Sequence, residues 1–154
     1  MMGPRTNLWL LPAFVVVVTG IGFLIGGLIR PDAWFAALAK PSFNPPGWLF
    51  GPVWAVMYVL IGVAGWRTWT SDEEGVRTTS WVLQLFTNYS WTPVFFGLHA
   101  IGWALFVIVA LLAQIVIFIV VSWRKDRISA ALFLPYAAWV TFASGLNLAI
   151  FLLN

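Results

Sequence analysis

The part of the sequence from Thr78 to Trp123 contains no charged side chain. A helix needs about 20 mainly apolar residues to cross the hydrocarbon core of a bilayer, so this part is too long for one crossing and has the right length for two. Pro93 and Gly97 lie near its middle, and both residue types interrupt helices. The pattern therefore predicts a hairpin of two membrane-spanning helices over residues 80–96 and 101–123.

The composition indicates that lipid is the solvent for most of this chain. Charged residues make up 8% of the sequence, against about 25% in an ordinary globular domain, and the mean hydropathy is +0.94. So few charges cannot cover a surface that faces water. The sequence has no cysteine, a single histidine (His99) and no basic patch interleaved with aromatic residues. It excludes a disulfide framework, offers poor material for a metal centre and gives no sign of nucleic-acid binding.

Three further apolar runs complete the predicted membrane domain. They cover residues 8–29, 51–69 and 129–153, and charged or proline-rich sequence separates them from their neighbours. The first run is too long for the apolar core of a signal peptide, so we interpret it as a retained helix. The predicted fold class is an all-α integral membrane protein, a bundle of five transmembrane helices in a single domain over residues 1–154.

The segment between the first two spans, residues 30–50, is rich in proline. Its prolines forbid a continuous helix. They are Pro31, Pro41, Pro45 and Pro46. Asp32 can still cap one or two helical turns that run through Trp34 to Leu38. We therefore predict a structured loop that lies on the membrane surface.

Lysine and arginine are distributed unequally between the two predicted sides of the membrane. One side carries Arg5, Arg67, Arg77, Arg124, Lys125 and Arg127, and the other carries Arg30 and Lys40. The positive-inside rule then places the N-terminus and the charged turns in the cytoplasm. The 30–50 loop, His99 and the C-terminus are predicted on the opposite side. For a prokaryotic protein, the membrane is expected to be the cell membrane.

Uncharged polar side chains and large aromatic rings share helical faces within the spans. One face carries Gln84, Asn88, Trp91 and Phe95, which are spaced four, three and four residues apart. Two further faces carry Trp54, Tyr58 and Ile61, and Trp139, Phe142, Ala143, Leu146 and Asn147. Apart from Arg67 at the end of the 51–69 span, no charged residue lies within any span, which argues against an ion pump. These faces fit a shared ligand cavity and hydrogen-bonded helix packing equally well.

Two smaller features favour ordinary structural roles. Gly22 and Gly26 form a small-xxx-small pair that permits close helix approach, within the chain or between subunits. As a signal of dimerisation this pair is weak, because glycine is common in membrane helices. His99 lies at the tip of the predicted hairpin, and the favoured interpretation there is an exposed loop histidine.

Three longer motifs appear in one order along the chain. They are KPSFNPPGWLFGPVW over 40–54, QLFTNYSWTPVFFG over 84–97 and PYAAWVTFASGLN over 135–147. Together they resemble the tryptophan-rich sensory protein family, also called translocator proteins or peripheral-type benzodiazepine receptors, over essentially the whole chain. The resemblance implies a five-helix bundle, commonly a homodimer, whose cavity below the 30–50 loop accepts porphyrins and isoquinoline or benzodiazepine-type ligands. It implies no required cofactor and no metal.

The resemblance also implies which residues line the pocket. The matched positions are Trp34, Phe35, Pro45, Pro46, Trp54, Tyr58, Asn88, Trp91, Thr92, Phe95, Trp139, Phe142, Ala143 and Leu146. The helical-face argument adds Gln84, whose amide is expected to orient a ligand together with Asn88. The carboxylates of a porphyrin are expected near Lys40 or Arg30, because charged groups avoid the hydrocarbon core.

Two departures from the family pattern limit the ligand prediction. Family members often have Trp-Tyr where this chain has Trp34 and Phe35, so a phenolic hydroxyl is missing. The sterol-linked pattern near the C-terminus needs an aromatic hydroxyl and a basic residue after Leu146 and Asn147, and neither is present. High-affinity cholesterol binding is therefore not expected.

These features predict a membrane receptor or carrier for porphyrins and related hydrophobic ligands, acting in tetrapyrrole regulation, transport or stress response. One alternative is light-dependent degradation of porphyrin, with Trp54 and Trp139 as electron donors. Another is a ligand-regulated signalling partner. A binding protein is favoured first, a signalling partner second and an enzyme third.

Overall fold

The computed structural model describes residues 7–154, so Arg5, which contributes to the predicted charge bias, lies outside the described residues. Within that range the chain forms helices and no strands, which confirms the all-α class. The elements are α1 (Leu10–Leu28), α2 (Ala33–Ala37), α3 (Gly47–Ser71), α4 (Val76–Thr92), the π-helix η1 (Pro93–Gly97), α5 (Ile101–Trp123) and α6 (Arg127–Leu153).

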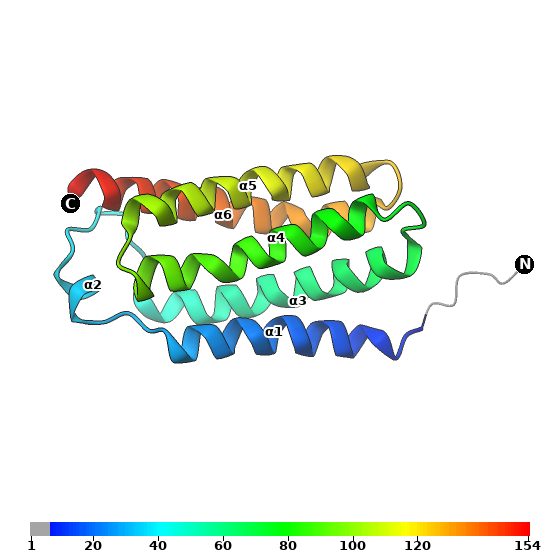
Figure 1. The fold of residues 1–154 in the computed structure, drawn as a ribbon, viewed down its shortest axis with the longest axis horizontal. Helices are drawn as coiled ribbons and strands as arrows, with labels where there is room; N and C mark the ends of the chain where they lie inside the picture. Colours follow the sequence, from blue (N-terminus) through cyan, green and yellow to red (C-terminus); the bar gives the residue numbers. More distant parts are fainter. Residues whose placement is uncertain (1–6) are drawn as a thin grey trace, which may run out of the picture.

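The long helices lie side by side along the longest axis of the molecule (Figure 1). Helix α1 lies at one edge next to α3, α5 and α6 form the opposite edge, and α4 runs between them. The short α2, the α4–α5 connection and the C-terminus gather at one end of the molecule. The α3–α4 and α5–α6 turns lie at the other end. The proline-rich loop and the charged turns are therefore at opposite ends.

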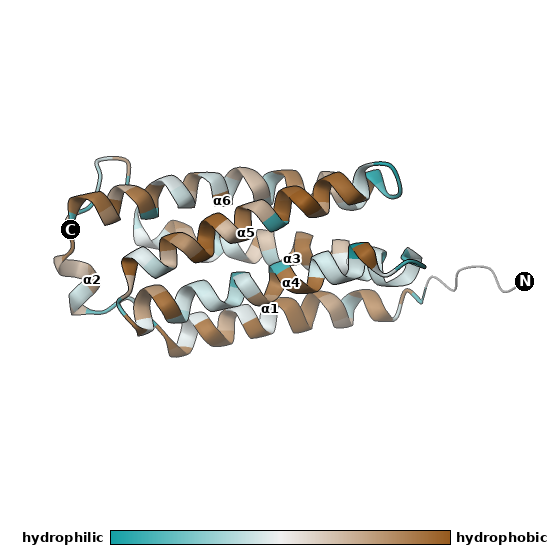
Figure 2. Cartoon of the chain, turned by 45° about the horizontal axis from the view of Figure 1, so that its top comes forward, coloured by the Kyte–Doolittle hydropathy of each residue, from teal (hydrophilic) through white to brown (hydrophobic). Residues whose placement is uncertain are grey.

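Four helices, α1, α3, α5 and α6, are long and apolar enough to cross a membrane. They correspond to four of the five predicted spans. Figure 2 shows the hydrophobic residues along these helices and hydrophilic ones at the α5–α6 turn. Helix α4 is shorter, with 17 residues, and contains Arg77, Gln84 and Asn88. Length and composition alone therefore do not identify α4 as a span.

The predicted span over 80–96 is not one continuous α-helix. Helix α4 ends at Thr92, and the chain continues as η1, in which Leu98 N donates to Pro93 O at 2.9 Å. Pro93 has no N–H group to donate to the carbonyl oxygen four residues before it, so one α-helical hydrogen bond is lost at the point where η1 begins. The wider π-helical turn places Phe95 in the interior, where its side chain is 1% exposed.

The proline-rich segment is also shorter than predicted. Helix α3 begins at Gly47, whereas the loop was expected to extend to residue 50. Pro46 has an extended backbone and precedes the helix directly, and no proline follows it in the first helical turn. At the other end of the segment, the predicted cap is confirmed, because Asp32 Oδ1 accepts from Phe35 N at 3.1 Å at the start of α2.

The bundle has an apolar interior and a largely apolar outer surface. Ile61, Ile115 and Phe133 have no exposed surface, whereas Phe86 and Val120 are 72% and 66% exposed. Lipid tails are as apolar as these side chains, so outward-facing phenylalanine and valine carry no penalty in a membrane. The surface thus agrees with the lipid solvent predicted from composition.

An ion pair joins the charged turns at the end opposite α2. The Nη2 and Nε groups of Arg67 donate to Oδ1 and Oδ2 of Asp126 at 2.8 and 3.1 Å. Ser129 Oγ donates to the same carboxylate at 2.6 Å, and Asp126 also caps the start of α6. Burial opposes ionisation of Asp126, but the hydrogen bonds from Arg67 and Ser129 outweigh it and hold the pKa of Asp126 below its usual value.

Acidification is expected to destabilise this end of the bundle through Asp126. A carboxyl group with a lowered folded-state pKa contributes stability above its unfolded pKa of about 4, and this stability is lost as the pH falls through the folded pKa. Asp126→Asn should lower the free energy of unfolding at pH 7 by about 1.5–3 kcal/mol. It should also flatten the loss of stability between about pH 5 and pH 2, as measured by thermal unfolding in detergent.

Glu74→Gln is the matched control for Asp126→Asn. Glu74 pairs with Lys125 at 2.8 Å, but both side chains are more than half exposed. Such surface pairs contribute about 1 kcal/mol or less. If Asp126→Asn and Glu74→Gln lost stability equally and kept the same acid dependence, the Arg67–Asp126 pair would not stabilise the bundle.

Candidate functional site

A cavity of about 670 Å³ lies at the α2 end of the bundle. Its walls come from α1, α3, α4, η1, α5 and the connection over residues 29–46, which we call the lid segment. The lining residues are Gly22, Phe23, Gly26, Gly27, Ile29, Arg30, Pro31, Phe35, Asn44, Pro45, Gly47, Phe50, Gly51, Trp54, Tyr58, Asn88, Trp91, Thr92, Phe96, Ile108 and Leu111. The volume lies within the range of about 300–1,000 Å³ that is usual for small-molecule sites.

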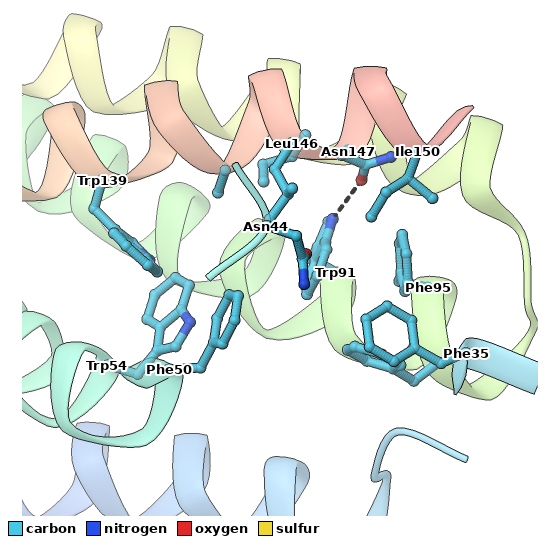
Figure 3. Close-up of a pocket in the computed structure, with 13 residues that line it drawn as sticks. Phe35, Asn44, Phe50, Trp54, Trp91, Phe95, Trp139, Leu146, Asn147 and Ile150 are labelled. Atoms are coloured by element: carbon cyan, nitrogen blue, oxygen red, sulfur yellow. Dashed lines mark hydrogen bonds between the residues drawn. The ribbon is translucent and has the colours of Figure 1, made fainter. Parts of the chain in front are cut away.

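A smaller hollow of about 60 Å³ adjoins the cavity and extends to α6. The two hollows share Phe35, Asn44, Phe50, Trp54, Trp91, Phe96 and Ile108 as wall residues. Because of these shared walls, we treat the hollows as two compartments of one site. Figure 3 shows Trp139 of α6 and Trp54 of α3 approaching each other across this space, with Phe50 beside Trp54.

A hydrogen-bonded network fixes the amide of Asn88 in the cavity wall. Asn88 Nδ2 donates to the hydroxyl of Tyr136 at 2.6 Å, and this hydroxyl donates to Gln84 Oε1 at 2.9 Å. The Tyr58 hydroxyl donates to Asn88 Oδ1 at 3.4 Å. Asn88 and Tyr58 line the cavity, whereas Gln84 and Tyr136 are fully buried behind them. The network therefore determines which way the Asn88 amide faces a ligand.

Two indoles of the smaller compartment differ in their hydrogen bonding. Trp91 Nε1 donates to Asn147 Oδ1 at 3.0 Å, as Figure 3 shows. Trp139 Nε1 is buried and has no hydrogen-bond partner among the described residues. A buried N–H group without a partner costs about 1–3 kcal/mol. Trp139 thus contributes an unpaired indole donor within the wall of this compartment.

The lid segment is attached to the α4–α5 connection at His99. The imidazole Nε2 lies 3.0 Å from Asp32 Oδ2, and the ring stacks on Trp34 with centroids 4.1 Å apart. The hydrogen bond from Phe35 N is the main cause of a pKa of Asp32 below its usual value, and His99 adds to this effect. His99 is exposed, as expected, but it takes part in these contacts and is not a free loop side chain.

Helix α6 provides a second attachment for the lid segment. Asn154 Nδ2 donates to Ala39 O, and Ala39 N donates to Asn154 Oδ1, both at 3.0 Å. Lys40 Nζ closes the end of α2 by donating to the carbonyl oxygens of Phe35, Ala36 and Leu38. Contacts on both sides of α2 therefore hold the lid segment over the site.

Comparisons with known proteins agree with this architecture. The TspO/MBR family model matches residues 13–153. The chain belongs to the TspO/MBR family. The tryptophan-rich protein TspO of Archaeoglobus fulgidus is 38% identical over 154 residues, which cover 96% of this chain and 99% of that relative. Protein CrtK of Rhodobacter capsulatus is 35% identical over 133 residues, 84% and 83% of the two chains. The human translocator protein is 33% identical over 119 residues, 74% and 70% of the two chains.

The family match confirms the resemblance inferred from the three sequence motifs. The family match also indicates that the four apolar helices lie in a membrane. A TspO/MBR member with helices of this length and hydropathy is an integral, multi-pass membrane protein.

Most of the residues that the TspO/MBR resemblance implied lie in the walls of the site. They are Phe35, Pro45, Trp54, Tyr58, Asn88, Trp91, Thr92, Phe95, Trp139, Ala143 and Leu146. The lid segment, α3, α4, η1 and α6 each contribute some of them. The three helical faces therefore converge, and α1 and α5 complete the walls.

Four of the predicted site residues lie outside the walls. Gln84 is fully buried and supports Asn88 through Tyr136, so it is a positioning residue and does not face the cavity. Trp34 packs against His99 and the edge of Phe95. The other two are Pro46, which precedes α3, and Phe142, which is 36% exposed.

The sequence reasoning missed two kinds of wall residue. Gly22, Gly26 and Gly27 of α1 line the cavity through their backbone, and their spacing was read only as a sign of close helix packing. Ile108 and Leu111 of α5 resemble every other aliphatic residue of that helix in the sequence, so no local signal identifies them. The motif residues Asn44 and Phe50 also form walls, and their position within the first motif could have indicated this role.

Proposed function

We propose that this protein is a membrane receptor or carrier that binds a flat, mainly apolar tetrapyrrole between the indoles of Trp54, Trp91 and Trp139. The observation that carries the proposal is a cavity of about 670 Å³ whose walls are aromatic and apolar, with one oriented amide at Asn88. Ligand sites combine such walls with a few fixed polar groups.

Aromatic walls favour a planar aromatic ligand. Ring contacts contribute about 0.5–1.5 kcal/mol beyond the burial of apolar area. The oriented Asn88 amide in the cavity wall supplies a directional hydrogen bond to such a ligand. The relatives named translocator protein and tryptophan-rich sensory protein support a role in binding or carrying a ligand within the membrane.

We also propose that α4 is a fifth membrane span. It lies alongside α5, and its polar side chains face inward, since Gln84 and Asn88 are 0% and 5% exposed while Leu83 and Phe86 are 54% and 72% exposed. Burying the amides satisfies their hydrogen bonds inside the protein and leaves apolar groups toward lipid. With five spans, the positive-inside rule places the charged turns in the cytoplasm and the lid segment on the opposite side.

Titration of the purified protein with protoporphyrin IX, followed by tryptophan fluorescence, tests the binding proposal. We expect saturable quenching in the wild type and about a tenfold weaker affinity in Trp54→Ala, because the variant loses one aromatic contact and part of the apolar wall. Trp103→Ala is the control, since Trp103 is 72% exposed on the outer surface of α5 and does not line the site.

Two results would contradict the binding proposal. Quenching that does not saturate, or that Trp54→Ala and Trp103→Ala weaken equally, would place the porphyrin outside the cavity. A new chromophore that forms from bound porphyrin under illumination, and that Trp54→Phe or Trp139→Phe abolishes, would support the enzymatic alternative.

A further inference from the structure

Among the described residues that line the larger cavity, Arg30 alone carries a charge. It follows the last residue of α1, Leu28, and lies in the lid segment beside Ile29 and Pro31, which also line the cavity. Arg30 therefore borders an apolar site at the end of the molecule where α1 ends. A cation at this position also interacts favourably with the carbonyl end of the α1 helix dipole.

The Nε group of Arg30 donates a hydrogen bond within the described residues, and its Nη groups do not. Its Nε donates to Gly27 O at 2.9 Å, which holds the side chain against the end of α1. Within the described part of the chain, the carboxylates that form ion pairs are bound by other residues, namely Arg67, Arg77, His99 and Lys125. The two Nη groups of Arg30 are thus available for an anion. A planar guanidinium binds a carboxylate with two parallel hydrogen bonds.

Lys40, the other basic residue of the lid segment, is already engaged. Its Nζ donates to Phe35 O, Ala36 O and Leu38 O at 2.6, 3.3 and 3.1 Å, which accounts for its three N–H donors. It also lies 4.5 Å from the centre of the Phe35 ring. The two basic residues that the sequence could not distinguish therefore have different roles, because Lys40 closes α2 and Arg30 faces the cavity.

The acidic residue nearest to Arg30 in the sequence, Asp32, forms no ion pair with it. Asp32 Oδ1 accepts from Phe35 N, and Oδ2 lies against His99 Nε2. Both carboxylate oxygens are thus directed to the start of α2 and to the α4–α5 connection. The positive charge of Arg30 remains available at the edge of the cavity.

We infer that Arg30 binds a carboxylate of the ligand, so that the site selects amphipathic anions with a flat apolar body. This inference rests on the proposed function and names the chemical group that the proposed ligand presents. The apolar rings fill the aromatic cavity, and the carboxylate stays at its edge, because an ionised group is costly in the hydrocarbon region.

A comparison of protoporphyrin IX with its dimethyl ester tests the inference, because the two ligands share one ring system and differ only in the ionised carboxylates. The full-length protein is placed in nanodiscs of neutral phosphatidylcholine, and dissociation constants are measured by fluorescence. We expect Arg30→Gln to weaken binding of the free acid about tenfold, the lower end expected for hydrogen bonds to a charged group. Binding of the ester should stay within twofold, which also shows that the variant is folded.

Two variants sharpen this comparison. Arg30→Lys keeps the charge but lacks the planar fork, so it should recover only part of the affinity for the free acid. Arg124→Gln removes one charge from the opposite end of the molecule, and it should leave the ratio of the two affinities unchanged. In the wild type, the affinity for the free acid should fall as salt is added, because salt screens a charge contact. The same fall should be absent in Arg30→Gln.

The outcomes separate the inference from the proposed function. If the wild type binds both ligands but Arg30→Gln weakens them equally or not at all, the carboxylate does not contact Arg30, and the cavity proposal stands without it. A guanidinium that binds only lipid phosphate gives this same result. If the wild type binds neither ligand, the proposed function and the inference are both overturned.

Discussion

Gly62→Ala is expected to lower the free energy of unfolding by about 1–3 kcal/mol, whereas Gly51→Ala in the same helix should leave it unchanged or raise it. A Cβ atom on Gly62 would lie 2.8 Å from Val15 Cα and 3.3 Å from Phe14 O. These are backbone atoms of α1, so no side chain can rotate away and α1 itself must move from α3. At Gly51 nothing lies within 4 Å of an added Cβ.

Thermal unfolding of the two variants in the same detergent measures this difference. The glycine-to-alanine change is identical, so helix propensity, which favours alanine by about 1 kcal/mol, cancels between them. The remaining difference reports the contact between α1 and α3. Equal stability of the two variants would mean that α1 and α3 do not contact each other at Gly62. It would also contradict the position of α1 beside the cavity.

The positions of the apolar helices could be predicted from hydropathy, because a membrane permits few structures other than helices of about 20 residues. The predicted span over 8–29 and helix α1 (Leu10–Leu28) agree within two residues at each end, as do the span over 129–153 and helix α6 (Arg127–Leu153). The π-helix after Thr92 could not be predicted, because Pro93 signals an interruption but not the shape of the turn that accommodates it.

The walls of the site could be predicted less completely than the helices. Helical periodicity identified the face of α4 that carries Asn88 and Trp91, and the structure brings that face to the cavity. Periodicity places residues on one helical face, but it does not show which of them reach the cavity and which are buried behind others. Gln84 was therefore expected to contact ligand, although it lies behind Asn88 and contacts Tyr136. Tyr136 lies in the third motif, but the motif does not show its role, which depends on a residue 48 positions away.

The sequence also could not distinguish residues by the partners they already have. Lys40 and Arg30 are both basic and both lie in the proline-rich segment. Only the folded lid segment shows that carbonyl groups of α2 use the donors of Lys40, while Arg30 borders the cavity. Such hydrogen bonds depend on the path of the backbone, which residue types and spacing do not determine.

Gly22→Ala is expected to weaken porphyrin binding about tenfold, whereas Gly26→Ala, one turn further along the same wall, should change it less than twofold. A Cβ on Gly22 would lie 2.3 Å from Tyr58 Cε2, so the tyrosine ring must move. The ring has little freedom, because Trp54 and Tyr89 pack within 5.3 and 6.1 Å of its centre. Overpacking of this kind costs about 1–3 kcal/mol, and here it deforms the cavity wall.

Gly26 provides the matched control because nothing lies within 4 Å of its added Cβ, although it lines the same cavity. The contrast also tests the origin of the small-xxx-small pair. If Gly22 and Gly26 served contact between subunits, both alanine variants should alter the oligomeric state measured by light scattering. In this structure Gly22 instead receives a ring from α3 of the same chain.

A double-variant cycle tests whether contact with Tyr58 causes the loss of porphyrin affinity expected in Gly22→Ala. Tyr58→Leu removes the ring that an alanine at position 22 would meet, so Gly22→Ala should cost almost nothing further in that background. Residues in direct contact show interaction energies of about 0.5–3 kcal/mol in such cycles, whereas independent sites are additive. Additive losses of porphyrin affinity would mean that Gly22→Ala acts by another route, and that the close approach of α1 to Tyr58 does not shape the ligand site.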